Sequence, residues 1–308
     1  MEKALTREAY GKTLAKLGEN HHFYVMDADL AGSTQTEIFR KKYPERFIQC
    51  GIAEANMINM AAGIATTGIP VFASSYAIFT AGRCYEQIRT SVCYPKLNVK
   101  IAATHAGVTV GEDGASHQCC EDISLMRNIP GMVVVSPADA TEAALATEAI
   151  LEYNGPVYLR LSRSASPVIF DENYQFQLGK GVVLQDGNDI AIFSTGIVLG
   201  EVLQAAENLK QKGLSVAVIN IHTIKPIDQE LVIKYASKCK HLFTVEEHSI
   251  IGGLGSAIAE VTAEHQPVKL TRIGIKDIFG SSGDPSGMFK RYGLDYESIE
   301  ETILKSLK

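Results

Sequence analysis

Three short segments of this 308-residue sequence carry side chains whose types and positions could do chemistry. In the first, Gly-Ile-Ala-Glu-Ala-Asn at 51–56, Glu54 stands between an apolar, strand-like stretch and an Ala- and Met-rich, helix-like stretch. A carboxylate in that position is expected to be largely buried, where an unpaired charge is costly. Glu54 is therefore a candidate catalytic group, although a glutamate favoured by the dipole at a helix amino terminus would explain the same pattern.

The second segment supplies two aromatic rings. Tyr76 and Phe79 are three residues apart, so they would lie on one face of a helix that follows an apolar, strand-like run. Two interpretations fit this spacing. The rings either pack into the core, or they form a flat wall for a ligand at the end of the strand.

The third segment is a long polar loop. His105 follows the apolar run 99–104, and the string Gly-Glu-Asp-Gly-Ala-Ser-His-Gln at 111–118 adds Asp113 and His117. The loop is longer than a simple turn between a strand and a helix. Long polar loops at strand ends commonly carry function, and a merely solvated loop is the alternative interpretation.

These segments need a scaffold, and short apolar runs alternate with helix-like runs along the whole chain. The predicted strands are residues 23–26, 47–50, 71–74, 99–104, 132–136, 157–161, 190–193, 216–220, 241–245 and 270–273. The predicted helices are 55–67, a long helix that ends toward Tyr94, 141–152, 201–211 and 297–307. This alternation predicts an α/β protein of two doubly wound, parallel-type domains. Ligands collect at the carboxyl ends of parallel strands, where all three segments stand.

The break between the two predicted domains is a polar, glycine-containing stretch at 167–181. We therefore expect one domain at residues 1–173 and a second at 174–308. Hydrophobic residues make up 46% of the chain, which is enough to bury a core in each. A net charge of −6 leaves no overall basic surface, so nucleic acid is not an expected partner.

The composition also indicates the cellular compartment in which the protein is expected. We expect neither a membrane span nor a secretory signal, because the chain lacks a long apolar run and residues 1–15 lack an apolar core. Six cysteines without a C-x-x-C pair predict reduced thiols, no zinc site and a cytoplasmic protein.

Taken together and in this order, the three segments resemble the carboxyl-terminal half of transketolase. The string at 111–118 is the most specific match. Further matches are Ala-Asp-Leu-Ala-Gly-Ser at 28–33, Leu-Ser-Arg at 161–163 and Gly-Gly-Leu-Gly at 252–255. The resemblance covers nearly the whole chain. It implies a pyrimidine-binding thiamine-diphosphate domain followed by a transketolase C-terminal-like domain, with two-carbon ketol transfer between sugar phosphates as the reaction.

The resemblance also implies roles for individual residues. Glu54 matches the glutamate that hydrogen-bonds the pyrimidine ring of thiamine diphosphate, and it would be catalytic together with His117. Tyr76 and Phe79 would stack on that ring, and Asp29 would lie near the cofactor. Sugar hydroxyls would be contacted by Asp113 and His117. The phosphate end of the substrate would be bound by Arg7, Ser33, His105 and Arg163, since arginine can bind phosphate oxygens bidentately.

Two departures from the family pattern are visible. Gly82 stands where full-length members often have a further aromatic residue, and Tyr85 is a possible substitute one turn later. The chain also lacks the Gly-Asp-Gly segment that anchors the diphosphate and Mg²⁺ in the family. We therefore expect no metal ligands here. A separate amino-terminal subunit would bind the diphosphate and most of the Mg²⁺, in an α2β2 assembly, and a start at Met1 favours this over a fragment.

Three other functions remain open at this point. The chain could be the β subunit of a 2-oxo-acid dehydrogenase first component, a subunit resembling deoxyxylulose-phosphate synthase, or a homologue without catalysis. Asp113 with His117, and the set of Arg7, Ser33 and Arg163, favour a sugar phosphate. The second domain is expected to build the dimer interface and not to contact the cofactor. Its Glu-Glu-His run at 246–248 is interpreted as a hydrogen-bonded strand end.

Overall fold

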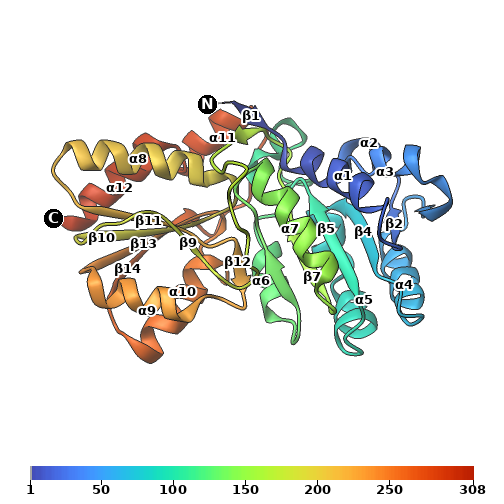
Figure 1. Cartoon of the computed structure of the whole chain (residues 1–308). Coiled ribbons are helices and arrows are strands. Elements are labelled where there is room, and N and C mark those ends of the chain that lie inside the picture. Colours follow the sequence, from blue (N-terminus) through green and yellow to red (C-terminus); the bar gives the residue numbers. More distant parts are fainter. Residues whose placement is uncertain (1) are drawn as a thin grey trace.

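The computed structural model describes residues 2–308 as two α/β domains, each with one sheet between two layers of helices (Figure 1). The first sheet has seven strands. In spatial order they are β12 (Thr223–Lys225), β6 (Val133–Val135), β7 (Val157–Arg160), β5 (Val99–Thr104), β4 (Val71–Tyr76), β2 (Tyr24–Asp27) and β3 (Phe47–Gln49). All are parallel except β12.

Helices cover both faces of this sheet because its central strands are apolar on both sides. On one face, α1 (Thr6–Leu17) packs against α7 (Ala140–Glu152), and Tyr10, Phe23 and Phe72 fill the space below them. The other face is covered by α4 (Glu54–Ala65), α6 (Asp122–Asn128) and the segment 78–93 between them. Short helices α2 (Ala31–Thr34) and α3 (Glu37–Lys42) pack beside α1.

The segment 78–93 is not the single long helix that was predicted. It consists of a π-helical turn at Ile78–Gly82, the short α5 (Tyr85–Gln87) and a second π-helical turn at Ile88–Cys93. The amide of Arg83 donates to the carbonyl of Ile78, five residues back. Thr80 contributes to this irregularity because its hydroxyl also bonds the carbonyl of Tyr76. Such π turns occur frequently at functional sites.

The second sheet has five strands, in the order β14 (Lys269–Ile275), β13 (His241–Ser249), β10 (Ile190–Thr195), β11 (Val216–Asn220) and β9 (Val182–Gln185). Only β9 runs antiparallel to its neighbour. One face is covered by α8 (Leu199–Gln211) and α12 (Tyr296–Leu307), and the other by α9 (Gln229–Lys238) and α10 (Leu254–His265). Helix α11 (Pro285–Tyr292) instead reaches toward the first domain.

The predicted strands all occur, with ends that differ by up to four residues, but the sequence pattern missed three pairings at the edges. Strand β9 was not predicted. Strand β12 belongs by sequence to the second half, yet it joins the first sheet beside β6. Near the amino terminus, β1 (Lys3–Ala4) pairs with β8 (Ser166–Pro167). These strands are too short to show an alternating pattern, so only tertiary contacts define them.

Residues 168–181 form no helix or strand, and the predicted boundary at 173/174 lies inside this segment. Buried polar contacts hold the linker to both domains. The Glu142 carboxylate accepts hydrogen bonds from Tyr174 in the linker, at 2.7 Å, and from Asn220 in the second sheet, at 2.8 Å. Burial raises the pKa of Glu142 to about 7. No helix among residues 2–308 combines the length and the apolar character that a membrane span requires.

A second buried contact joins the domains at the loop after β5. The Glu247 carboxylate, on β13, accepts a hydrogen bond of 2.7 Å from the backbone amide of Thr109. The side chain packs directly over Gly107, whose φ is +79°. A Cβ atom on Gly107 would lie only 2.3 Å from the Glu247 carboxylate. Gly107 is therefore required both by its backbone conformation and by this close approach.

We expect Gly107→Ala to reduce the free energy of unfolding by about 2–4 kcal/mol, from the left-handed backbone and the overpacked contact together. Urea unfolding of the chain alone measures this. The control is Gly63→Ala on α4, where an added Cβ meets no atom within 4 Å. That change should stabilise the chain by about 0.5–1 kcal/mol, as is usual inside a helix. Equal effects of the two substitutions would contradict the interpretation of the Gly107 contact.

Candidate active site

The residues singled out in the sequence gather at one edge of the first sheet. They follow the carboxyl ends of five adjacent strands, β3, β2, β4, β5 and β7. Parallel strands bring their carboxyl ends to the same edge, so segments far apart in sequence meet there. Arg7 joins them from the first turn of α1.

Glu54 is the first residue of α4 and only 3% exposed. Its Oε2 atom accepts a hydrogen bond of 2.8 Å from Nη1 of Arg83, a half-exposed side chain that follows the first π turn. The guanidinium carbon of Arg83 lies 4.8 Å from the centre of the Phe79 ring. The sequence analysis did not identify Arg83. Its position four residues after an aromatic residue was the available signal.

Four rings form a continuous cluster beside this ion pair. Tyr76 stacks on His105 with ring centres 3.8 Å apart, and it lies nearly parallel to Phe79 at 5.8 Å. His117 meets the Phe79 ring edge-on at 5.5 Å. Both the aromatic pair and the two predicted histidines are thus brought together. The cluster offers flat apolar surface next to imidazole nitrogens.

His105 is held in an uncommon conformation. Its φ is +57°, and its Nδ1 atom lies 2.9 Å from the hydroxyl of Thr104. Burial lowers the pKa of His105 to about 3, and the nearby cations Arg7 and Arg163 act in the same direction. The ring is therefore neutral at physiological pH, with one nitrogen able to donate a hydrogen bond and the other to accept one.

Arg7 and Arg163 form the cationic side of the site. Arg7 donates to the carbonyl of Ser33 at 2.5 Å, while its Nε atom is buried and has no partner among residues 2–308. Burial lowers the pKa of Arg7, and the Arg163 charge lowers it further. Arg163 donates to Glu112 at 2.6 Å and to the carbonyl of Val110. Two guanidinium groups that repel each other favour an anion between them.

Asp27, which the sequence analysis overlooked, positions Asp29 and Ser33. It is fully buried at the end of β2 and accepts hydrogen bonds from the Leu30 amide at 2.6 Å and the Thr34 hydroxyl at 2.6 Å. Burial raises the pKa of Asp27, and these hydrogen bonds act against that effect. Asp29 itself is exposed at φ +64°, and its amide donates to the Gln49 side chain at 2.8 Å.

The loop 107–118 carries Asp113 and His117, and both domains hold it. Gln118 donates to the carbonyl of Ser281 at 2.8 Å, and Glu247 binds the Thr109 amide as described above. Asp113 is exposed. The second domain therefore does more than was expected of it, since it positions a loop of the candidate site.

The run 246–248 on β13 also has defined partners. Glu246 accepts from the backbone amides of Leu254 and Gly255 at the start of α10. His248 accepts from the amide of Ser124 at 3.3 Å and lies 2.7 Å from the carbonyl of Ser249. No group of three or more metal-ligating side chains occurs among residues 2–308.

The sequence offers Tyr85 as a possible substitute for a further aromatic residue at position 82. Tyr85 lines a separate cavity with Ser124 and Arg127 beside α6. The Arg83 guanidinium lies over the Phe79 ring instead, with its carbon 4.8 Å from the ring centre. A Cβ atom at Gly82 would come within 3.3 Å of Ile78, because the π turn crowds this position.

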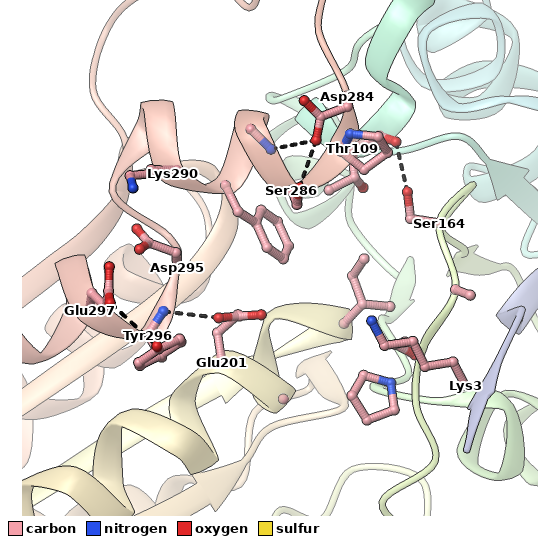
Figure 2. A pocket seen from close by; sticks show the side chains of 18 residues that line it. Lys3, Thr109, Ser164, Glu201, Asp284, Ser286, Lys290, Asp295, Tyr296 and Glu297 are labelled. Atoms are coloured by element: carbon pink, nitrogen blue, oxygen red, sulfur yellow. Dashed lines mark hydrogen bonds between the residues drawn. The ribbon is translucent and has the colours of Figure 1, made fainter. Parts of the chain in front are cut away.

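The structure also contains a cavity of about 500 Å³ between the two domains (Figure 2), and Glu54 is not among the residues that line it. Its walls come from the loop after β7 and from the amino-terminal ends of α8, α11 and α12. Acidic side chains already cap two of these helices: Asp284 accepts from the Gly287 amide at 2.9 Å, and Glu201 accepts from the Tyr296 amide at 2.9 Å. The cavity between the domains is therefore lined by both polar and apolar side chains.

This arrangement defines a two-domain α/β protein with a buried carboxylate beside stacked rings at one sheet edge. Residues 2–168 match the transketolase pyrimidine-binding domain, and residues 179–299 match the transketolase C-terminal domain. The chain therefore belongs to the transketolase family. The predicted family and fold class are confirmed.

Three relatives of similar length show which part of a transketolase this chain resembles. A transketolase C-terminal section from Methanocaldococcus jannaschii is 52% identical, covering 98% of this chain and 96% of that protein. A 6-deoxy-6-sulfo-D-fructose transketolase subunit from Clostridium sp. (strain MSTE9) is 40% identical, covering 97% and 93%. A solved structure described as a split-gene transketolase, inactive beta4 tetramer, has a TM-score of 0.91 at 46% identity and covers 98% of both chains. The prediction of a transketolase subunit is confirmed at this level.

The low pKa of His105 gives a testable dependence of stability on pH. The ring has a pKa near 6.5 when unfolded and about 3 when folded, so the unfolded chain binds the extra proton between these values. Stability is therefore present above pH 6.5 and lost as the pH falls, by about 2 kcal/mol at pH 5. His105→Asn keeps a residue that tolerates positive φ and should show a correspondingly smaller loss between pH 7 and pH 5 in urea unfolding. The same loss in both proteins would contradict this assignment.

Proposed function

We propose that this chain is the carboxyl-terminal subunit of a split transketolase, which transfers a two-carbon ketol unit from a ketose phosphate to an aldose phosphate. It would act together with a separate subunit that binds the diphosphate of the cofactor. The observation that carries the proposal is that one planar group, the Arg83 guanidinium, contacts both the buried Glu54 carboxylate and the Phe79 ring. Relatives described as separate transketolase sections or subunits support it.

The residues at this position fit the pyrimidine half of thiamine diphosphate. A planar guanidinium lies over Phe79 and donates to Glu54, so the site accepts a flat group that carries a hydrogen-bond donor. Glu54 would bind a ring nitrogen, Phe79 and Tyr76 would provide the stacking surface, and Asp29 would lie nearby. When bound, the cofactor supplies a stabilised carbanion for the transferred unit. Glu54, which is only 3% exposed, would hold the proton shared with the ring.

The cationic side of the site fits the anionic end of a sugar. Arg7 has a buried Nε atom without a partner in residues 2–308, which a phosphate oxygen would satisfy. Neutral His105 could donate a hydrogen bond without adding charge, and Ser33 lies next to Arg7. Arg163 would bind the same phosphate, and Asp113 and His117 would contact sugar hydroxyls. One relative is named for 6-deoxy-6-sulfo-D-fructose, a sugar that also ends in an anion.

The proposal assigns the diphosphate and Mg²⁺ mainly to the partner subunit, because this chain has no Gly-Asp-Gly segment. The site would then lie between subunits of an α2β2 assembly, and carboxyl-terminal subunits would also contact one another. A relative that forms a tetramer of β chains alone is described as inactive, in keeping with this requirement. A cytoplasmic location and a place in pentose phosphate metabolism complete the proposal. The six cysteines, all free, agree with a reducing compartment.

The decisive experiment is a ketol-transfer assay with xylulose 5-phosphate, ribose 5-phosphate, thiamine diphosphate and Mg²⁺. We expect no activity from this chain alone and activity after addition of a Gly-Asp-Gly-bearing transketolase half. Glu54→Gln in the mixture should lower turnover at least about 100-fold, because proton transfer in the site depends on the carboxyl group. Its circular dichroism spectrum should match the unsubstituted chain. Activity from 2-oxo acids with a lipoyl acceptor, and none with sugars, would instead support a 2-oxo-acid dehydrogenase component.

Arg163→Ala tests the phosphate end. Loss of a charge-assisted hydrogen bond of about 1.5–3 kcal/mol predicts an apparent KM for phosphorylated sugars that is about 10- to 100-fold higher. Unphosphorylated ketols should be affected much less. Glu112→Gln is the control, because it removes the carboxylate that pairs with Arg163 and leaves the guanidinium in place. An equal rise of the apparent KM for phosphorylated and unphosphorylated sugars would contradict the assignment of Arg163 to the phosphate site.

A further inference from the structure

Arg83 lies in the space that the proposed function gives to the cofactor ring. Its Nη1 atom donates to Glu54 Oε2 at 2.8 Å, and its guanidinium carbon is 4.8 Å from the centre of the Phe79 ring. The group is planar, carries several N–H donors and stacks on aromatic faces. A carboxylate on one side and an aromatic face on the other are the two contacts expected for a bound aminopyrimidine.

We propose that Arg83 occupies the pyrimidine position while the subunit is free, and that it must withdraw from Glu54 before thiamine diphosphate can bind. This inference rests on the proposed function, since it identifies the planar ligand of the site. Arg83 is then a positioning residue. It keeps the Glu54 carboxylate directed toward Phe79 before the cofactor arrives.

The contacts of the two partners explain why Arg83, and not Glu54, would move. Glu54 is 3% exposed and fixed at the start of α4, whereas the Arg83 side chain is 52% exposed. Within residues 2–308 the guanidinium makes no hydrogen bond other than the one to Glu54. Arg83 also follows a π turn, so its backbone is not part of a regular helix. Its withdrawal therefore breaks one ion pair and one ring contact, and no packed core.

The ion pair has a clear benefit for the free subunit. A buried carboxylate without a partner is strongly destabilising, because the protein must remove it from water without compensation. Arg83 supplies that partner for as long as the other half of the site is absent. Few groups face the Arg83 guanidinium. The Phe79 ring lies against it. The neighbouring Cys84 thiol has a pKa that burial raises to about 12. No second cation among the described contacts competes for Glu54.

Occupation by Arg83 lowers the measured affinity for the cofactor, since the apparent dissociation constant is the intrinsic one divided by the fraction of open sites. We would titrate thiamine diphosphate with Mg²⁺ by calorimetry into this chain mixed with a Gly-Asp-Gly-bearing transketolase half, which supplies the diphosphate site of the proposed function. Arg83→Met should lower the apparent dissociation constant about 3- to 10-fold relative to the unsubstituted chain, whether or not activity is present. Arg89→Met is the control, because Arg89 is exposed on the same segment and should leave the constant unchanged. Equal binding, weaker binding or no binding by Arg83→Met would overturn the proposal.

A second readout does not depend on ligand affinity. Arg83→Met should lower the thermal midpoint of the free chain, since it leaves Glu54 unpaired, and the same change in a Glu54→Gln background should have no such effect. Arg83→Lys, which keeps the charge, should restore most of the midpoint. An equal decrease of the thermal midpoint in both backgrounds would contradict the proposal. Failure of the proposed function would show itself differently, as a lack of ketol transfer in the two-subunit mixture while this coupling between Arg83 and Glu54 persists.

Discussion

A charged group that leaves water must find a partner, and this constraint determines most contacts at the carboxyl edge of the first sheet. Asp27 is paired with the backbone and hydroxyl groups of its own loop, and so it fixes the chain from 27 to 36. Glu54 is paired with Arg83, whose guanidinium also contacts the Phe79 ring. Arg7 is satisfied only in part, because its Nε atom remains without a partner in residues 2–308. The site thus contains both completed and incomplete sets of hydrogen bonds.

The same constraint connects the two domains. Glu247 is buried on the second sheet, and burial raises its pKa, yet one of its oxygens accepts from the Thr109 amide in the first domain. Arg160, at the end of β7, donates to Asp122 at 2.8 Å and to the backbone carbonyl of Glu247 at 2.9 Å. The loop between β5 and α6 is therefore held from both sides. Its length does not make it flexible, because a second domain supplies the missing partners.

The sequence was sufficient to predict what depends on local pattern. Buried strands such as 99–104 and 216–220 appear with the predicted limits, because a continuous apolar run between polar turns is a strong signal. Glu54, Tyr76 and His105 could be located because each lies at the end of a predicted strand or a few residues after it. Edge strands β9 and β12 could not, since their pairing is set by tertiary contact. Nor could the break of the 78–93 helix be predicted, because π turns leave no distinct pattern of residue types.

Arg83 shows why the candidate site could only partly be predicted. Its sequence neighbours suggest a solvated arginine on a helix, and only the structure reveals that the π turn brings it to Glu54, twenty-nine residues earlier. Family comparison emphasises groups that bind ligands, whereas Arg83 acts on the unliganded chain. A subunit that holds half of a site faces a problem that a complete enzyme does not, since its buried carboxylate must remain stable before the partner and cofactor arrive. A half-exposed cation that also fits the aromatic face would solve this problem and leave the carboxylate correctly oriented.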